Sequence, residues 1–280
     1  MSETRPMQIR VENADDPAVA EFRDIRERDL VGRTGRFIAE GTVVLNMLAA
    51  AHGQENGFRA EKILVLENRL AGIADTLNRF PEDVPVYTAS AAVIDAIAGF
   101  HLHRGVLALG RKPEPRPLDE ALTRLPERAL VTVLSGISNH DNAGAIFRNS
   151  AAFGASLIIL DETSCDPLYR KAIRVSVGSV LTVPFHRGGS IDEILMKLDR
   201  AGFAVWGLSP AGQHPLRDLP ASNRTALLLG TEGQGLPSDL MARINTARIA
   251  QMPGLDSLNV ATAAALSLHE MAHRMGLLSE

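Results

Sequence analysis

The chain has 280 residues, of which 45% are apolar and 22% are charged, a balance that excludes an intrinsically disordered protein. Its 29 Lys and Arg residues against 33 Asp and Glu residues give a formal net charge of −4. This charge excludes a polycation that coats nucleic acid through bulk electrostatics, but it does not exclude a protein that acts on nucleic acid.

Cysteine usage and hydropathy bear on the compartment. Cys165 is the one cysteine, so no internal disulfide can form, and a reducing environment is expected. The N-terminal segment has no apolar signal-peptide core, and no apolar run approaches the roughly 18 residues of a membrane span. We therefore expect a cytoplasmic protein with no membrane partner.

A Pro-rich stretch divides the chain into two predicted domains. Prolines at 113, 115 and 117 alternate with other residues, mostly charged, which favours extended chain. We place a linker at 111–125, between an N-terminal domain at 1–110 and a C-terminal domain at 126–280.

The N-terminal domain alternates helical and strand-like runs, which predicts a small α/β domain. Helices are expected at 17–30, 40–51 and 91–100, and strands at 62–66, 84–88 and 105–110.

The C-terminal domain repeats strand and helix more regularly, with apolar runs typical of strands buried on both faces. Strands are expected at 129–134, 156–160, 181–185, 203–208, 226–230 and 247–252. Helices are expected at 143–152, 167–176, 191–201, 237–244 and from about 257 to 275. This alternation predicts an α/β fold with a mostly parallel sheet, in which ligands bind at the carboxyl ends of the strands.

Three polar segments follow predicted strands. The first contains Asn142, which we expect to cap a helix, and Arg148, which lies roughly 120° from it around the helix axis. By itself this segment is equally well explained as a capped amphipathic helix with a solvated arginine.

The second segment is a glycine-rich turn between a strand and a helix. Gly230, Gly233 and Gly235 expose backbone polar groups to a ligand, as such turns do. The turn lacks the dinucleotide pattern and the G-K-[ST] ending of a P-loop. Because the carboxylate of Glu232 would repel phosphate, the ligand is expected to carry a cationic or donor group. The alternative is a tight turn with no ligand.

The third segment follows a strand and a Pro253–Gly254 turn. Ser257 or Asn259 is expected to cap a long helix that is rich in small residues, which allows close packing on a neighbouring helix or on another subunit. By itself this is a well-capped core helix.

Together the segments resemble the SpoU/TrmH family of RNA ribose 2′-O-methyltransferases, within the SPOUT superfamily. The family pattern N-x-G-A-I-x-R is met by residues 142–148, L-G-x-E-G-x-G by 229–235, and S-L-N-V by 257–260. The resemblance extends in order over about 129–276. One departure is Ile-Ala-Gln-Met-Pro-Gly at 249–254, where Ile-Pro-Met followed shortly by Gly is more usual.

The resemblance implies a C-terminal domain knotted into a trefoil, a homodimer, and an N-terminal ribosomal-protein-like module that binds RNA. It implies S-adenosylmethionine as the cofactor, with no metal. Backbone groups around five residues would hold this cofactor: Gly230, Gly235, Ile249, Met252 and Leu258.

The resemblance also assigns catalytic roles. Arg148 matches the catalytic arginine, which in the family acts near the cofactor of the other chain. Asn142, Glu232, Ser257 and Asn259 match residues that orient Arg148 and shape the ribose pocket, with Glu232 as the expected ion-pair partner of Arg148. The implied reaction is methyl transfer to a ribose 2′-hydroxyl of rRNA or tRNA.

Two other functions remain open. A non-catalytic RNA-binding or ribosome-assembly protein could use the same scaffold, although the intact site residues argue against it. His269, Glu270 and His273 form an H-E-x-x-H match that suggests a zinc hydrolase. Because Ser279 occupies the third ligand position of the longer metzincin pattern, we expect a solvated helix end instead.

Overall fold

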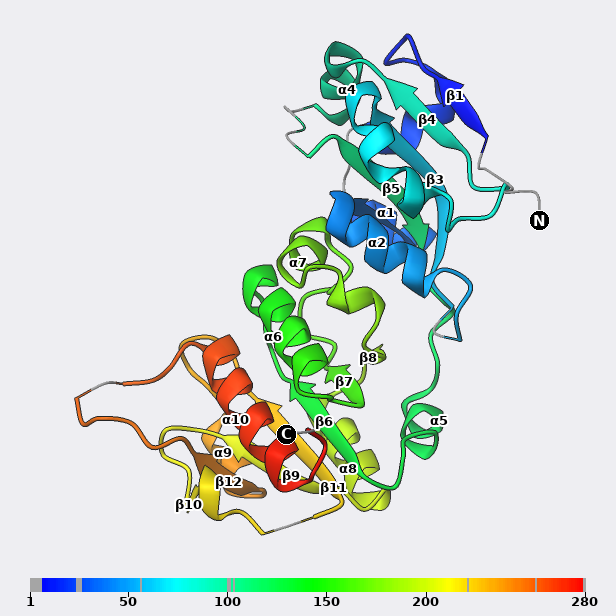
Figure 1. Ribbon diagram of the computed structural model, residues 1–280. Helices are drawn as coiled ribbons and strands as arrows, with labels where there is room; N and C mark the ends of the chain where they lie inside the picture. Colours follow the sequence, from blue (N-terminus) through cyan, green and yellow to red (C-terminus); the bar gives the residue numbers. More distant parts are fainter. Residues whose placement is uncertain are drawn as a thin grey trace. The chain divides into compact units, whose positions relative to one another are not determined.

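The computed structural model describes residues 7–23, 27–55, 57–99, 102, 104–220, 222–254 and 256–278, with the side chains of 27–29 excepted. Internal contacts divide the chain into two units (Figure 1). Unit 1 comprises Met1–Glu114 and Leu168–Thr182, and unit 2 comprises Pro115–Pro167 and Val183–Glu280.

Unit 1 is built on a five-stranded mixed sheet with the order β1-β4-β3-β5-β2. β1, β4 and β3 are parallel, whereas β5 runs antiparallel to β3 and β2. The strands are β1 (Gln8–Arg10), β2 (Arg36–Glu40), β3 (Arg59–Leu66), β4 (Val86–Ala89) and β5 (Val106–Arg111). The α-helices are α1 (Glu27–Thr34), α2 (Thr42–Ala51), α3 (Ala74–Leu77), α4 (Ala91–Ala98) and α7 (Arg170–Val175).

Both faces of this sheet are covered, which explains why β4, residues 63–65 of β3 and residues 106–110 of β5 are buried. One face packs against α4 and a 3-10 turn at Pro17–Phe22, around buried residues such as Ile38, Leu64 and Ile94. On the other face, Gly110 leaves room for the ring of Phe37, since a Cβ at Gly110 would lie 2.3 Å from that ring.

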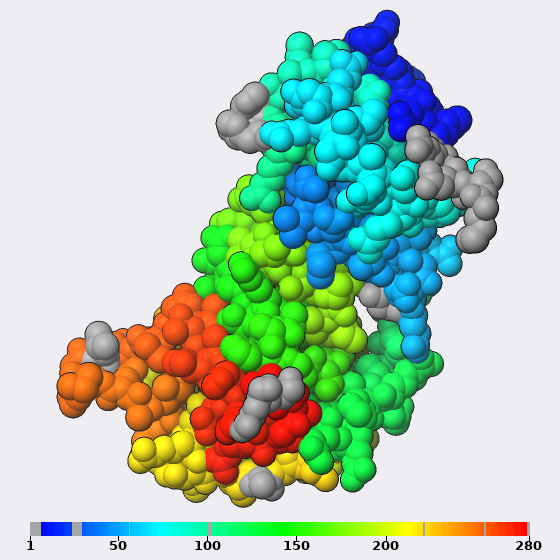
Figure 2. Space-filling model, in the orientation of Figure 1, coloured from blue at the N-terminus to red at the C-terminus, as the bar shows by residue number. Residues whose placement is uncertain are grey.

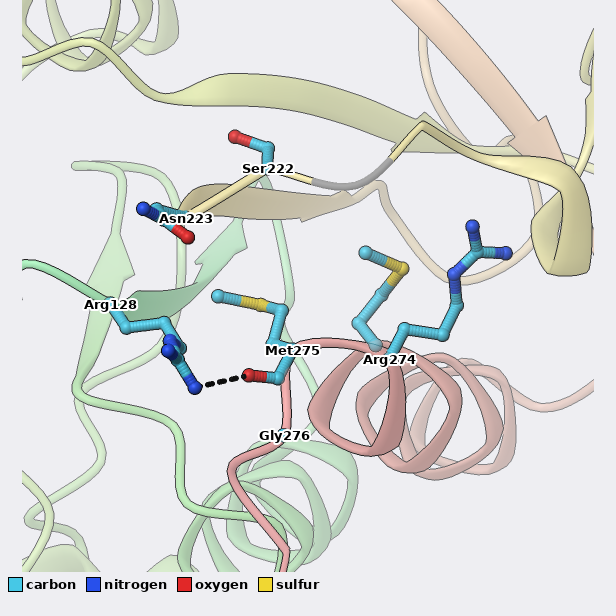
Figure 3. Close-up of a pocket in the computed structure, with 7 residues that line it drawn as sticks. Arg128, Ser222, Asn223, Arg274, Met275 and Gly276 are labelled. Carbon is cyan, nitrogen blue, oxygen red and sulfur yellow. Dashed lines mark hydrogen bonds between the residues drawn. The ribbon is translucent and has the colours of Figure 1, made fainter.

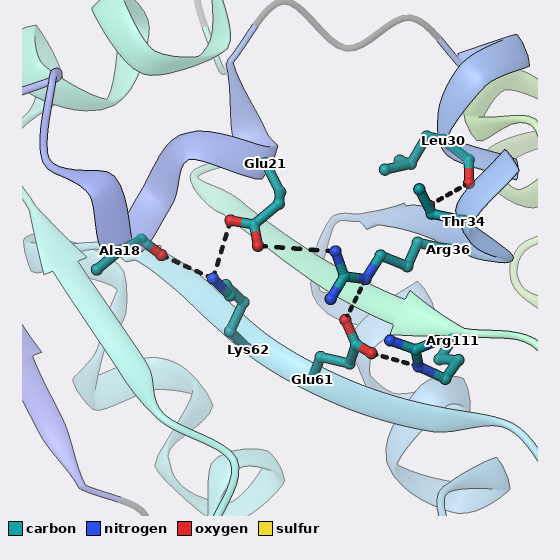
Figure 4. Close-up of polar contacts among 8 residues, drawn as sticks. All are labelled: Ala18, Glu21, Leu30, Thr34, Arg36, Glu61, Lys62 and Arg111. Atoms are coloured by element: carbon teal, nitrogen blue, oxygen red, sulfur yellow. Dashed lines mark hydrogen bonds and ion pairs between the residues drawn. The ribbon is translucent and has the colours of Figure 1, made fainter.

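A chain of charged side chains crosses one end of this sheet (Figure 4). Lys62 pairs with Glu21 at 2.9 Å, and Arg36 pairs with Glu61 at 2.7 Å. Glu61 also accepts a hydrogen bond from Arg111. Because each carboxylate neutralises a neighbouring cation, the cluster stabilises unit 1 modestly.

Segment 168–182 belongs to unit 1 although its sequence neighbours belong to unit 2. Arg170 lies 3.8 Å from the buried carboxylate of Glu40. A Cβ at Gly178 would lie 2.7 Å from the side chain of Met47 in α2. The small residue at 178 therefore permits this segment to approach α2 closely.

Unit 2 is built on a seven-stranded sheet with the order β10-β12-β9-β11-β6-β7-β8, in which every pair is parallel. The strands are β6 (Ala129–Leu134), β7 (Leu157–Leu160), β8 (Phe185–Arg187), β9 (Ala204–Leu208), β10 (His214–Pro215), β11 (Arg224–Leu229) and β12 (Asn245–Arg248). The helices are α5 (Leu118–Thr123), α6 (His140–Ala152), α8 (Ile191–Arg200), α9 (Ser238–Met241) and α10 (Val260–Arg274).

Helices cover both faces of this parallel sheet, as predicted. α5, α8 and α9 contribute buried residues such as Leu122, Leu198 and Leu240 to the core on one face. α6 and α10 lie side by side, and Asn149 of α6 donates to the carbonyl of Ala261 at 2.9 Å (Figure 1). The predicted α/β fold with a mostly parallel sheet is therefore confirmed.

Several elements begin or end at other residues than predicted, and some were not predicted. α5 occupies 118–123, so part of the predicted extended linker is helical, and its buried Leu118 and Leu122 explain why. Strands β1 and β2 were not predicted. Residues 179–181 form a 3-10 turn, so the strand expected at 181–185 begins at Phe185 instead.

Candidate active site

A cavity of about 700 Å³ opens in unit 2 where β9, β11 and β12 end. This is the edge at which parallel sheets bind ligands, and the volume is typical of a small-molecule site. Eight predicted site residues line it: Asn142, Gly230, Glu232, Gly235, Ile249, Ser257, Leu258 and Asn259. Two predicted residues, Arg148 and Met252, do not.

The glycine-rich loop forms one wall because its backbone folds back on itself. Gly235 donates to the carbonyl of Thr231 at 3.0 Å, and the Thr231 hydroxyl donates to the carbonyl of Gly235 at 3.2 Å. A Cβ at Gly230 would lie only 2.4 Å from the backbone of Gly235. Gly233 and Gly235 have φ angles of +98° and +69°, which glycine adopts without strain.

Glu232 turns its carboxylate toward the start of α6. It accepts hydrogen bonds from the backbone amides of Ser138 at 3.3 Å and Asn139 at 3.2 Å, and from the side chain of Asn142 at 3.1 Å. Partial burial raises the pKa of Glu232, but the hydrogen bonds outweigh that effect and hold its pKa below the ordinary 4.5. The cavity therefore has a carboxylate that stays ionised at neutral pH.

This carboxylate gives a pH dependence with a definite sign. A depressed pKa stabilises the folded chain above pH 4.5, and the contribution disappears as the pH falls through the folded-state pKa. We expect wild type to be more stable than Glu232→Gln at pH 7, with the difference shrinking as the pH falls below 4.5 and through the folded-state pKa. Urea unfolding at each pH measures this, and a difference independent of pH would contradict it.

A chain of amides links the three predicted segments. The side chain of Asn259 donates to the Oδ1 of Asn142 at 3.0 Å, and Asn142 donates onward to Glu232. Asn259 also caps α10, since its Oδ1 accepts from the amides of Ala261 and Thr262. One residue therefore fixes both a helix start and the rim of the cavity.

The cap of α6 was assigned to the wrong asparagine. Asn139 caps this helix by accepting from the amide of Asp141 at 2.8 Å, and Asn142 lies in the first turn. Its side chain is therefore available for Glu232 and Asn259.

Sequence reasoning missed the wall formed by residues 208–211 and the carboxylate of Asp256, which also line the cavity. Gly212 holds this wall against β12, because a Cβ there would lie 2.4 Å from the backbone of Ala247. Arg248 donates to the carbonyls of Gly212 and Gln213, both at 2.7 Å. In the sequence, the one signal for this wall is Gly212, which follows the predicted strand at 203–208.

Arg148 lies on the exposed side of α6, away from the cavity lining. The predicted ion pair with Glu232 is not formed within the described part of one chain. The reason is geometric: Asn142 and Arg148 point in different directions from the helix, and Glu232 is held by Asn142 and the loop amides.

Met252 follows β12 in the segment 249–254, which extends from unit 2 (Figures 1 and 2). Its side chain is 77% exposed, and the Pro253–Gly254 turn, with a φ of +94° at Gly254, carries the chain onward. The structure therefore brings Ile249 to the cavity but not the side chain of Met252.

A second hollow lies at the opposite, amino ends of β6 and β11 (Figure 3). Arg128 donates there to the carbonyl of Met275 at 3.2 Å, and Arg274 donates to the carbonyls of Arg217 and Leu219. These cations stabilise the C-terminal end of α10, where they are favourable to the helix dipole.

The H-E-x-x-H segment is part of α10. The ring of His269 packs edge-on against Phe153 with their centroids 5.4 Å apart. Across the described ranges, no group of three or more His, Cys, Asp or Glu side chains is arranged to hold a metal ion. In the same part of the chain, no helix has the length and apolarity to cross a membrane.

A parallel sheet between helical layers, with a loop-built cavity at its carboxyl edge, defines an α/β protein with a ligand site at that edge. The sequence profile of the SpoU rRNA methylase family matches residues 129–269, which contain all the residues that line the cavity. The chain belongs to this family of RNA methyltransferases.

Relatives cover both units. A Mycobacterium tuberculosis protein named as an uncharacterized tRNA/rRNA methyltransferase is 38% identical over 271 residues, covering 91% of this chain and 88% of that protein. An AdoMet-bound rRNA methyltransferase from Sinorhizobium meliloti superposes with a TM-score of 0.80 and 26% identity, covering 97% and 99%. An RNA 2′-O ribose methyltransferase structure matches with a TM-score of 0.73 and 26% identity, covering 96% and 100%.

Proposed function

We propose that this protein is an S-adenosylmethionine-dependent methyltransferase that modifies a ribose 2′-hydroxyl of rRNA or tRNA. The observation that carries the proposal is the chain from Asn259 through Asn142 to Glu232, which ties all three family segments to one cavity. The names of the relatives support it, since they describe a tRNA/rRNA methyltransferase, an AdoMet-bound enzyme and a 2′-O ribose methyltransferase.

The cavity fits the proposed cofactor chemically. Leu208, Leu236, Ile249 and Leu258 provide apolar walls that suit an adenine ring. Gly230 and Gly235 line the cavity, and we assign backbone hydrogen bonds to the cofactor at these residues and, by resemblance, at Met252. The carboxylates of Glu232 and Asp256 suit the positive charge of the cofactor's sulfonium group.

When bound, S-adenosylmethionine supplies a methyl group from a positively charged sulfonium. The acceptor hydroxyl is a weak nucleophile, so its proton must be removed or its developing charge stabilised. The guanidinium of Arg148 carries N–H donors and no acceptor atom. We propose that Arg148 orients the 2′-hydroxyl and the adjacent RNA phosphate. The phosphate then assists removal of the hydroxyl proton. Ser257 and Asn259 shape the ribose pocket at the cavity rim.

The position of Arg148 supports a homodimer. Within one chain it is exposed on α6 and outside the cavity lining. A second copy that packs on α6 would place one protomer's arginine beside its partner's cavity.

The remaining parts of the proposal rest on the family resemblance. We assign RNA binding to unit 1, a trefoil knot to the segment that carries the loops at 230–236 and 249–259, and a cytoplasmic location to the protein. That both loops line one cavity is consistent with the knot.

Titration calorimetry tests the proposal at the cofactor step. We expect S-adenosylmethionine to bind wild type with one site per chain, and Glu232→Gln to bind more weakly because an ionised acceptor is lost. If wild type binds RNA but neither binds S-adenosylmethionine nor transfers methyl groups, the alternative of a non-catalytic RNA-binding or assembly protein is correct.

A further inference from the structure

Asp161 is a buried carboxylate that the proposed reaction does not use. It follows β7 directly and is 4% exposed. The described part of the chain gives it no ion-pair partner. Burial raises the pKa of Asp161, but hydrogen bonds outweigh that effect and lower it. A buried ionised group of this kind persists only where donors surround it.

The donors come from two segments. From its own turn, Asp161 accepts from the hydroxyl of Thr163 at 2.9 Å and from the amide and hydroxyl of Ser164, both at 2.8 Å. From the loop after β6, it accepts from the Ser135 hydroxyl at 2.9 Å and the Gly136 amide at 3.1 Å.

The same cluster reaches the next residue of that loop. The hydroxyl of Ser164 accepts from the amide of Ile137 at 3.1 Å, and the amide of Cys165 donates to the carbonyl of Ile137 at 2.8 Å. Residues 135–137 are therefore fixed to the end of β7. The following two residues, Ser138 and Asn139, donate the amides that hold Glu232.

We propose that Asp161 is a positioning residue of the active site, which fixes the loop at 135–139 so that two of its amides orient the carboxylate of Glu232. This inference rests on the proposed function in one respect only, the use of Glu232 in the cofactor cavity. Asp161 touches neither the cavity nor Glu232, so its effect passes through the loop backbone.

Two hydroxyl deletions separate positioning from stability. Ser135→Ala and Thr163→Ala each remove one hydroxyl that donates to Asp161 at 2.9 Å, but only Ser135 belongs to the loop. We expect Ser135→Ala and Asp161→Asn to raise the Kd for S-adenosylmethionine by about threefold to tenfold, the effect of one weakened hydrogen bond. Thr163→Ala should stay within about twofold of wild type.

Calorimetry gives a readout that a merely structural role would not move. Irreversibly unfolded chains lower the number of sites per chain and leave the Kd of the folded chains unchanged, whereas a misplaced Glu232 raises the Kd at unchanged stoichiometry. Urea unfolding of each variant establishes that the folded state is fully populated under the conditions of the titration, so that reversible unfolding does not raise the apparent Kd. The exposed neighbour Glu162 provides a charge control, and Glu162→Gln should bind as wild type does. Equal Kd values for Ser135→Ala, Asp161→Asn and Thr163→Ala would overturn the inference.

Hydrogen exchange followed by mass spectrometry keeps this test independent of the proposed function. We expect Asp161→Asn and Ser135→Ala to accelerate exchange in peptides that cover 135–139 by about threefold or more, with Thr163→Ala unchanged. If wild type binds no S-adenosylmethionine, the proposed function fails, and these exchange rates still decide the role of Asp161. Unchanged exchange in all three variants would contradict it.

Discussion

Arg148→Ala is expected to reduce methyl transfer by about a hundredfold to a thousandfold, the cost of losing one group that stabilises developing charge. Because Arg148 is exposed, its loss should change the free energy of unfolding by less than about 0.5 kcal/mol. The cavity of the same chain is untouched, so S-adenosylmethionine affinity should be retained. Single-turnover rates, calorimetry and urea unfolding measure the three effects separately.

Arg200 provides the matched control, since it is also an exposed arginine near the end of a helix of unit 2. Arg200→Ala should transfer methyl groups at the wild-type rate. If Arg148→Ala does so as well, the assignment of Arg148 is wrong.

The second large effect is expected from Gly230→Ala. The new Cβ would lie 2.4 Å from the backbone of Gly235, which cannot move aside as a flexible side chain can. We expect a loss of about 1–3 kcal/mol in the free energy of unfolding and loss of measurable cofactor binding, because the loop wall is displaced. Gly72→Ala is the control, since a Cβ there meets nothing within 4 Å. Equal stability and binding in both variants would show that the close approach at Gly230 is unimportant.

These two variants together test the proposed dimer. If one protomer's Arg148 serves its partner's cavity, mixed dimers of Arg148→Ala and Gly230→Ala chains contain one intact composite site. Random mixing should then restore about one quarter of the wild-type activity. If the arginine and the cavity of the same chain form the site, no mixture of the two variants regains activity.

The sequence predicted the parts of the fold that periodicity controls. The apolar run at β6 and the strand–helix alternation of unit 2 were sufficient for a parallel sheet covered on both faces. The short strands β1 and β2 were missed because hydrogen-bonded partners far along the chain define them. The pairing of β2 with β5, for example, joins residues about 70 positions apart.

The motifs pointed to eight of the residues that line the cavity, but they did not predict the hydrogen bonds between them. Nothing in the spacing showed that Asn139 would cap α6 and leave Asn142 for Glu232, because both asparagines suit a cap. The wall at 208–211 and the anchor at Asp161 depend on contacts between separate loops. Such contacts become visible only when the strands are placed side by side.

The chemistry of the product tests the central claim most directly. Wild-type protein would be incubated with rRNA and tRNA from cells lacking the gene and with S-adenosylmethionine labelled in its methyl group. One portion of the RNA would then be hydrolysed in alkali, and another would be digested to nucleosides. We predict label in 2′-O-methylnucleosides and in alkali-stable dinucleotides, because the modified ribose cannot assist cleavage. Label in base-methylated nucleosides, or no label from an enzyme preparation that binds S-adenosylmethionine, would contradict the account.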